Sequence, residues 1–335
     1  MIHVQIRSEA VATGFHLLRL DLVPGIKELE LQFDTNPLLI AYSTVARPLP
    51  HVVSAILRMS PTAIGGRLHL RMAEVHKWFP NAEALEIEHL YSLQVPGHVT
   101  YPHIRQLGLA NGGPFNLPRI LRSLPHLKQL SLAEVELEGV DVVPELTLPH
   151  LEYLQLSGEG TGTSNWINKI KCPSLKTLII LDHSMDDVFD FLASHRSVET
   201  LELDGQTGYL AWLDQVHPNL KRLHVGGPYD EFVAHDAEPL LKSLETLVVS
   251  GDTLTLAEFE SVVRARALGR NHPLSQLATH CAPLDFRVCI DSNILETIKN
   301  SPDEWPSSDL YQTSRREVHK IERWTNYVEI SLSWD

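Results

Sequence analysis

The sequence has few cysteines and no long apolar run. Its three cysteines, Cys172, Cys281 and Cys289, have no CxxC spacing, which argues against a disulfide framework and fits a reducing compartment. The longest apolar runs, such as LIIL at 178–181, are far shorter than the roughly 20 residues of a membrane-spanning helix. The opening MIHVQIRSEAV lacks the unbroken apolar stretch of an export signal. We therefore expect a cytoplasmic or nuclear protein that does not contact a membrane.

Positive charge is also scarce. The chain has 28 Lys and Arg residues against 42 Asp and Glu residues, a formal net charge of −14, and its basic residues are scattered. Such a balance repels phosphate backbones, so we expect no nucleic-acid partner. The motifs GxSxG, HExxH, GxGxxG and the P-loop are all missing, and the sequence therefore predicts neither an enzyme nor a cofactor.

What the sequence does contain is a repeated apolar pattern, LxxLxL. The middle positions of its eight units follow one another at intervals of 22 to 24 residues, which is within the ~20–29 residue period of leucine-rich repeats. These positions are Leu85, Leu107, Leu130, Leu154, Leu178, Leu201, Leu223 and Leu247. Each unit is expected to form one short strand, with its leucines in a shared core and its neighbours stacked in parallel.

Two further columns of the repeat support this interpretation. A proline, which suits the start of a strand because it lacks an N–H, stands two residues before the first apolar position in several units: Pro102, Pro125, Pro149, Pro173 and Pro218. Two residues after the last apolar position come Asn111, Glu134, Gly158, Asp182, Gly205, Gly227 and Gly251. All of these except Glu134 are residue types that tolerate positive φ, as expected where a chain turns off a strand.

The units therefore predict an α/β leucine-rich-repeat solenoid of the ribonuclease-inhibitor type. Its parallel sheet would be concave, and short helices over 185–195 and 208–217 would lie on the convex side. The P-x-L-x-x-L-x-L units of residues 80–290, without a fixed Asn after the strand, resemble the irregular repeats of F-box proteins encoded by mushroom-type fungi. The resemblance implies repeats that bind a substrate protein, beside an F-box that docks on the adaptor of a cullin-type ubiquitin ligase. The alternative is a scaffold or regulator with no link to a ligase.

The pattern divides the chain into three regions. Residues 1–80 are expected to form an N-terminal cap with irregular repeats, residues 81–251 the regular repeats, and residues 252–335 a C-terminal helix, a strand and a polar tail. The cap would include alternating strands at Ile2/Val4/Ile6, Leu18/Leu20/Leu22 and Leu29/Leu31/Phe33. In the C-terminal region, the helix would cover 255–269, and strands would form at 284–290 and 328–334.

A degenerate F-box could occupy residues 49–79. LPHVVSAILRM at 49–59 and VHKWF at 75–79 resemble that family's opening Leu-Pro helix and its later tryptophan. Between them GGRLHLRM alternates with a period of two, which predicts a strand where an F-box has a helix.

Histidines recur at one position of three successive units, namely His103, His126 and His150. Stacked units would bring them about 5 Å apart, as a shared metal would need. Ser and Asn fill the same position elsewhere, however, and zinc prefers a tetrahedron to a straight row. The sequence therefore predicts a solvated corner and no metal site.

The variable positions that flank the buried leucines would point to the concave face. There Tyr153, Ile179 and Leu181 are expected to form an exposed apolar cluster, and exposed apolar clusters mark contact sites. Glu202 and Asp204 would face Arg222 and His224 as its polar rim. The predicted partner-binding residues are Tyr153, Gln155, Ile179, Leu181, Glu202, Asp204, Arg222 and His224. In the alternative, the protein's own side chains or its tail cover this cluster.

Overall fold

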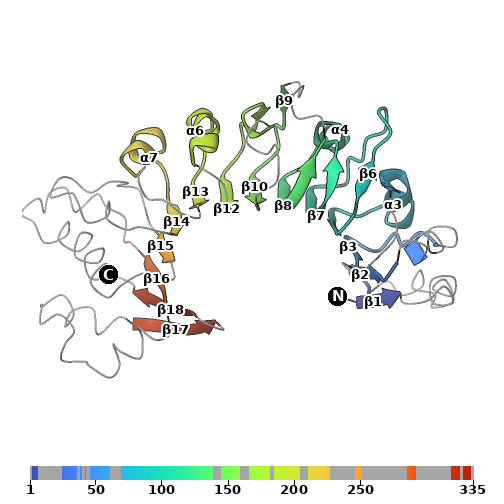
Figure 1. Ribbon diagram of the computed structural model, residues 1–335, viewed down its shortest axis with the longest axis horizontal. Helices are drawn as coiled ribbons and strands as arrows, with labels where there is room; N and C mark the ends of the chain where they lie inside the picture. The colour runs from blue at the N-terminus through green and yellow to red at the C-terminus, as the bar shows by residue number, and fades with distance from the viewer. Residues whose placement is uncertain are drawn as a thin grey trace, which may run out of the picture. The chain divides into compact units, whose positions relative to one another are not determined.

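A computed structural model describes residues 2–6, 25–35, 38–39, 42, 46–60, 69–138, 145–158, 166–181, 185–203, 210–226, 246–250, 285–291, 318–324 and 327–332. The chain divides into two compact units. The first unit consists of Met1–Leu175 and Asp186–Phe191, and the second consists of Lys176–Met185 and Leu192–Asp335. Each unit contains parallel strands and short helices, so the fold class is α/β (Figure 1).

The sheet of the first unit is parallel throughout, with the strand order β1-β2-β3-β5-β7-β8-β10. Its strands are β1 (Ile2–Ile6), β2 (Glu28–Phe33), β3 (Ser54–Met59), β5 (Ala84–Glu88), β7 (Gln106–Phe115), β8 (Gln129–Leu137) and β10 (Tyr153–Ser157). Each described strand therefore pairs with the next strand of the main sheet along the chain, as the repeated pattern predicts.

Short elements in the connections cover one face of this sheet. Two small parallel ladders join β4 (His69–Arg71) to β6 (Ser92–Gln94) and β9 (Leu146–Thr147) to β11 (Ile170–Lys171). The helices α3 (Met72–Trp78) and α4 (Leu117–Arg122) lie on the same side of the strands (Figure 1). Both helices bury apolar side chains, for example Trp78 of α3 and Ile120 of α4. The core lies between the helices and this face.

The second unit has the parallel order β12-β13-β14-β15-β16, and its last two strands, β18 and β17, are antiparallel. Its strands are β12 (Thr177–Leu181), β13 (Thr200–Leu203), β14 (Arg222–Gly226), β15 (Thr246–Ser250), β16 (Asp285–Asp291), β17 (Val318–Trp324) and β18 (Tyr327–Leu332). The helix α7 (Leu210–Val216) belongs to this unit, and α6 (Met185–Ser194) has its middle, Asp186–Phe191, in the first. The two helices fall where the sequence predicts them.

The leucines of the repeat are aligned strand by strand. In the first unit Leu85 pairs with Leu107, Leu107 with Leu130, and Leu130 with Leu154, and each of these side chains is at most 2% exposed. In the second unit Leu178, Leu201 and Leu223 form the same kind of column and are fully buried. Each interval of 22 to 24 residues thus places the next leucine directly beside the previous one on the neighbouring strand. The predicted strands and their parallel stacking are confirmed over these residues.

On four strands of the first unit, the residue two positions after the last apolar residue of the LxxLxL unit adopts the left-handed backbone conformation. In the first unit this column contains His89, Asn111, Glu134 and Gly158, with φ values of 57°, 52°, 50° and 89°. A residue other than glycine costs roughly 1 kcal/mol in this conformation. Glu134, the residue type least suited to it, adopts it as well, between residues of β8 that are paired with β7 on either side.

The N-terminal region is partly as predicted, because β1 and β2 occupy the segments expected at Ile2/Val4/Ile6 and Leu29/Leu31/Phe33. Strands β1, β2 and β3 are paired in parallel with one another, and β3 pairs with β5 on its other side. The F-box interpretation of residues 49–79 requires a helix at Ser54–Met59, where the structure has β3. The segment forms a strand because every second side chain, namely Ala55, Leu57 and Met59, is buried in the core. The predicted strand in GGRLHLRM is present as β4, and the one at Leu18–Leu22 lies outside the described residues.

The C-terminal region is partly as predicted. Strands β16 and β18 occupy the segments 284–290 and 328–334 with small shifts at their ends. Strand β17 was missed, because its sequence VHKIERW is mostly polar and resembles a loose tail. The predicted helix at 255–269 lies outside the described residues. None of the described helices combines the length and the apolar character needed to cross a membrane.

Gly158 offers a test of the column of left-handed residues, which we call the turn column and which consists of His89, Asn111, Glu134 and Gly158. It has a φ of 89°, and a Cβ there would come within 2.7 Å of Glu134 Cγ and 3.0 Å of the Glu134 backbone nitrogen. We expect Gly158→Ala to lower the free energy of unfolding by about 1–3 kcal/mol, through backbone strain and this close approach. Urea unfolding followed by circular dichroism measures the change.

Gly97→Ala is the matched control. A Cβ at Gly97 would meet only the Arg119 side chain, at 3.5 Å, and the residue is exposed, so we expect its unfolding midpoint to stay near that of the wild type. Equal stability of the Gly158 and Gly97 variants would contradict the role of the turn column.

Candidate functional site

One face of the sheet in the first unit is not covered by helices, and we call it the open face. Strand alternation puts the leucines on the opposite face, and the side chains of the open face are half-buried or exposed, apart from the buried Glu30. On strands β3 to β10 of the main sheet the open face consists of Ser54, Ile56, Arg58, Ala84, Glu86, Glu88, Gln106, Gly108, Ala110, Gln129, Ser131, Ala133, Tyr153, Gln155 and Ser157.

A groove of about 310 Å³ crosses the open face. Its floor lies on β7 and β8, where the side chains are small: Gly108, Ala110, Ser131 and Ala133. The flanking strands β5 and β10 carry larger side chains, so the floor is lower than its surroundings. The groove therefore results from a local lack of side-chain volume on two neighbouring strands.

The groove has two unlike walls. On β10, Tyr153 donates a hydrogen bond from its hydroxyl to Gln155 Oε1 over 2.8 Å, which holds the ring in place. On β5, Glu86 lies against Gly108, because its Cγ is only 3.2 Å from the position that a Cβ at Gly108 would take. The exposed Gln106 also lines the groove. One wall is thus aromatic and the other is acidic.

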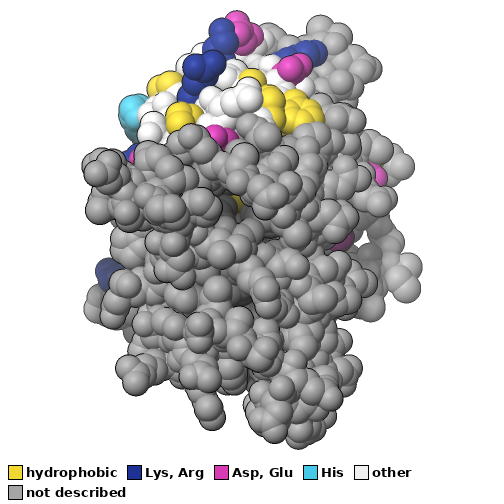
Figure 2. Space-filling view, turned by 90° about the vertical axis from the view of Figure 1, so that its left-hand side faces the viewer, with side chains coloured by type: hydrophobic (Ala, Val, Ile, Leu, Met, Phe, Trp, Pro, Cys, Tyr) yellow, Lys and Arg dark blue, Asp and Glu magenta, His cyan; other side chains and the backbone are white. Residues whose placement is uncertain are grey.

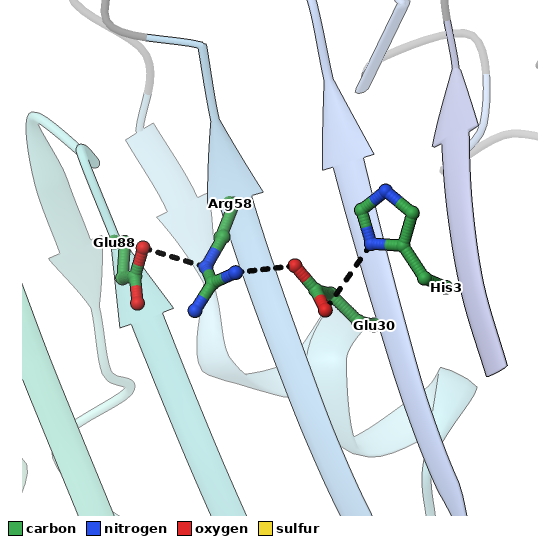
Figure 3. Close-up of polar contacts among 4 residues, drawn as sticks. All are labelled: His3, Glu30, Arg58 and Glu88. Carbon is green, nitrogen blue, oxygen red and sulfur yellow. Dashed lines mark hydrogen bonds and ion pairs between the residues drawn. The ribbon is translucent and has the colours of Figure 1, made fainter. Parts of the chain in front are cut away.

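A row of charged side chains continues from the acidic wall across β5, β3, β2 and β1 (Figure 3). Arg58 is placed between two glutamates: its Nε is 2.6 Å from Glu88 Oε2 and its Nη1 is 2.5 Å from Glu30 Oε1. His3 Nδ1 lies 3.1 Å from the other oxygen of Glu30. The side chain of Glu30 is only 9% exposed, so these contacts offset part of the cost of burying it.

These contacts leave the acidic wall with an excess of carboxylates. Burial raises the pKa of Glu86, and a hydrogen bond with Glu88 and the charges of Glu88 and Glu30 act in the same direction. Arg58 opposes the shift as a nearby positive charge, but its own close contacts are with Glu30 and Glu88. Three carboxyl groups therefore share one guanidinium next to the groove.

The predicted binding residues are divided between the two units. Tyr153 lines the groove and Gln155 is bonded to it, both in the first unit. Ile179 and Leu181 lie on β12 of the second unit, where both are half-buried. Asp204 lies outside the described residues. The structure therefore places Tyr153 in a groove of its own unit, and the apolar cluster that would join it to Ile179 stays a prediction.

The rim that was predicted beside that cluster is partly present in the second unit. His224 Nδ1 lies 2.9 Å from Glu202 Oε1, and this hydrogen bond lowers the pKa of Glu202. Arg222 is exposed on β14. Close by in sequence, Lys221 Nζ pairs with Glu199 Oε2 over 2.8 Å. Figure 2 shows a similar mixture on the described surface at the top of the view, where basic and acidic side chains lie among apolar ones.

The histidine row gives no sign of a metal site. His103, His126 and His150 are all exposed, and the rings of His126 and His150 are 5.6 Å apart, as stacked units require. In the part of the chain that the structure describes, no group of three or more His, Cys, Asp or Glu residues could hold a metal ion. Cys172 is buried, which raises its pKa to about 12, so this thiol is unsuited to act as a nucleophile.

Sequence reasoning missed the groove although a signal for it exists. Gly108 and Ser131 occupy one column, Ala110 and Ala133 occupy the next, and all four residues are small. Small residues were treated as background to the large ones, whereas here their smallness makes the site. The Glu30–Arg58 contact was missed because its strands were assigned to a cap. No protein-family model and no curated protein matches this sequence.

Arg58 tests how far the charged row stabilises the first unit. Arg58→Met leaves the buried Glu30 carboxylate without its main partner, and an unpaired buried charge is costly. We expect the free energy of unfolding to fall by about 1–3 kcal/mol, measured by urea unfolding. Part of the loss should return when Glu30→Gln is added, because that change removes the unpaired charge.

Lys128→Met provides the comparison. Lys128 and Glu152 form a pair at 3.4 Å in which both side chains are nearly half exposed. Breaking such a surface pair costs roughly 0–1 kcal/mol. A loss at Arg58 no larger than the loss at Lys128 would show that the row contributes little to folding.

Proposed function

We propose that this chain is a leucine-rich-repeat solenoid of the ribonuclease-inhibitor type that recognises another protein and has no enzymatic activity. The observation that carries the proposal is the groove on the open face of the first unit, which extends over strands from successive repeats. Parallel strands in sequence order, leucine columns in register and short helices on the opposite face support the solenoid part of the proposal.

The side chains around the groove suit a protein segment. Tyr153 provides a rigid ring with a polar end, a residue type that is common at protein interfaces. Gln106 and Gln129 offer both hydrogen-bond donors and acceptors, which is what an extended peptide backbone requires. The neighbouring carboxylates would repel a nucleic-acid backbone. The arrangement thus favours a polypeptide ligand.

Two versions of this function differ in what happens to the bound protein. The resemblance to fungal F-box proteins supports a substrate receptor of a cullin-type ubiquitin ligase. The alternative is a scaffold or regulator without a ligase, and strand β3 favours it, since Ser54–Met59 is part of the sheet where an F-box would need a helix. In both versions the open face binds the partner.

Filling the groove tests the proposal. Ser131 lies on the groove floor, and Ser131→Trp would occupy the space that a partner needs. In proximity labelling of the full-length protein, with a proteasome inhibitor present, we expect this variant to lose a specific subset of labelled proteins by about tenfold or more. Quantitative mass spectrometry measures the loss.

Gln94→Trp is the matched control, since Gln94 is an exposed neutral residue on β6, outside the main sheet. Labelling that is the same for Ser131→Trp and Gln94→Trp would contradict the proposed function. A cullin adaptor among the proteins labelled by both variants would support the ligase version. Its absence would support the scaffold version.

A further inference from the structure

We infer that the partner segment held in this groove carries a lysine or arginine side chain, and that Glu86 receives its positive charge. This inference rests on the proposed protein-recognition function and specifies the chemistry of the partner. It concerns a residue outside the predicted binding set, on the wall of the groove opposite Tyr153.

The placement of Glu86 is the first argument. Glu86 is on β5, and its side chain lies over Gly108, where the floor of the groove begins. Because Gly108 has no side chain, the Glu86 side chain reaches the groove. A larger residue at position 108 would displace it, since a Cβ there would be 3.2 Å from Glu86 Cγ. The carboxyl group of Glu86 is therefore available to a ligand that lies on the floor.

The second argument concerns the contacts of Arg58, the guanidinium next to this wall. Arg58 contacts Glu88 through Nε and Glu30 through Nη1. Glu86 lies on the same face of β5 as Glu88, and neither of these contacts of Arg58 is with Glu86. An incoming ammonium or guanidinium group can approach Glu86 from the groove and supply the positive charge that the carboxyl pair lacks.

The balance of charge on the surrounding face agrees with this. Along the described strands of the first unit the open face carries Glu28, Glu30, Glu86 and Glu88, against one arginine, Arg58, and one histidine, His3, which lies against Glu30. Burial and the neighbouring carboxylates raise the pKa of Glu86, in agreement with this excess of carboxyl groups. A basic partner is complementary to this face, and an acidic partner would be repelled.

The shape of the groove suits a long basic side chain. The floor between Glu86 and Tyr153 consists of Gly108, Ala110, Ser131 and Ala133, so an aliphatic stem can lie along it while its charged end meets the carboxylate. The Tyr153 ring, held by Gln155, forms the opposite wall and can contact the cation or the stem.

A random dodecapeptide library displayed on phage, selected on the full-length protein, provides the probe. Peptides that bind the wild type but not Ser131→Trp are groove-dependent. We expect these peptides to be enriched in Lys and Arg over Asp and Glu. Glu86→Gln should weaken the binding of a synthesised representative by about tenfold. Glu83→Gln, an equal change of charge at an exposed residue just before β5, should leave the Kd unchanged.

The same interaction can be tested from the peptide, with the protein unaltered. Replacing the selected lysine by methionine, or the arginine by citrulline, removes the charge and should raise the Kd by a similar factor. Groove-dependent peptides without basic enrichment, or with a Kd that this neutralisation leaves unchanged, would overturn the inference while leaving the proposed function in place. If no selected peptide depends on the groove, whether the binders are basic, acidic or apolar, both would be overturned.

Discussion

The register of the leucine columns is the constraint on which the rest of the structure depends. Leu85, Leu107, Leu130 and Leu154 occupy matching positions on parallel strands and are buried together. Shifting one strand by a single residue would exchange its buried and exposed faces. Once the leucines are fixed, the position of every other side chain on these strands is fixed too, and this includes every residue of the open face.

The open face is therefore the part of the first unit that can vary without loss of the core. Small side chains on β7 and β8 produce the groove, while Glu86 and Tyr153 on the flanking strands give it unlike walls. The acidic wall has a cost, because Glu30 and Glu88 depend on Arg58 for compensation. The basic partner that we propose would supply positive charge to this wall.

The elements that could be predicted from sequence are those in which one local pattern decides the outcome. Strands such as β8 and β12 follow from leucines at a fixed period, because burial of that face outweighs other preferences. The possible F-box at residues 49–79 rested on a resemblance of LPHVVSAILRM to that family's opening helix, and pairing of Ser54–Met59 with β2 and β5 makes this segment a strand. The groove could not be predicted from any single repeat, since it arises from small residues that neighbouring repeats bring together. The Glu30–Arg58 contact was likewise hidden in the sequence, because its residues are 28 positions apart.

The central claim is that the open face of the first unit contacts another protein. Site-specific photo-crosslinking tests it most directly, with a benzoylphenylalanine placed either at Gln129, exposed on β8, or at Arg119, exposed on α4 at the opposite face. The account predicts discrete crosslinked products from position 129 in living cells and none from position 119. Crosslinks that form only from position 119 would contradict it.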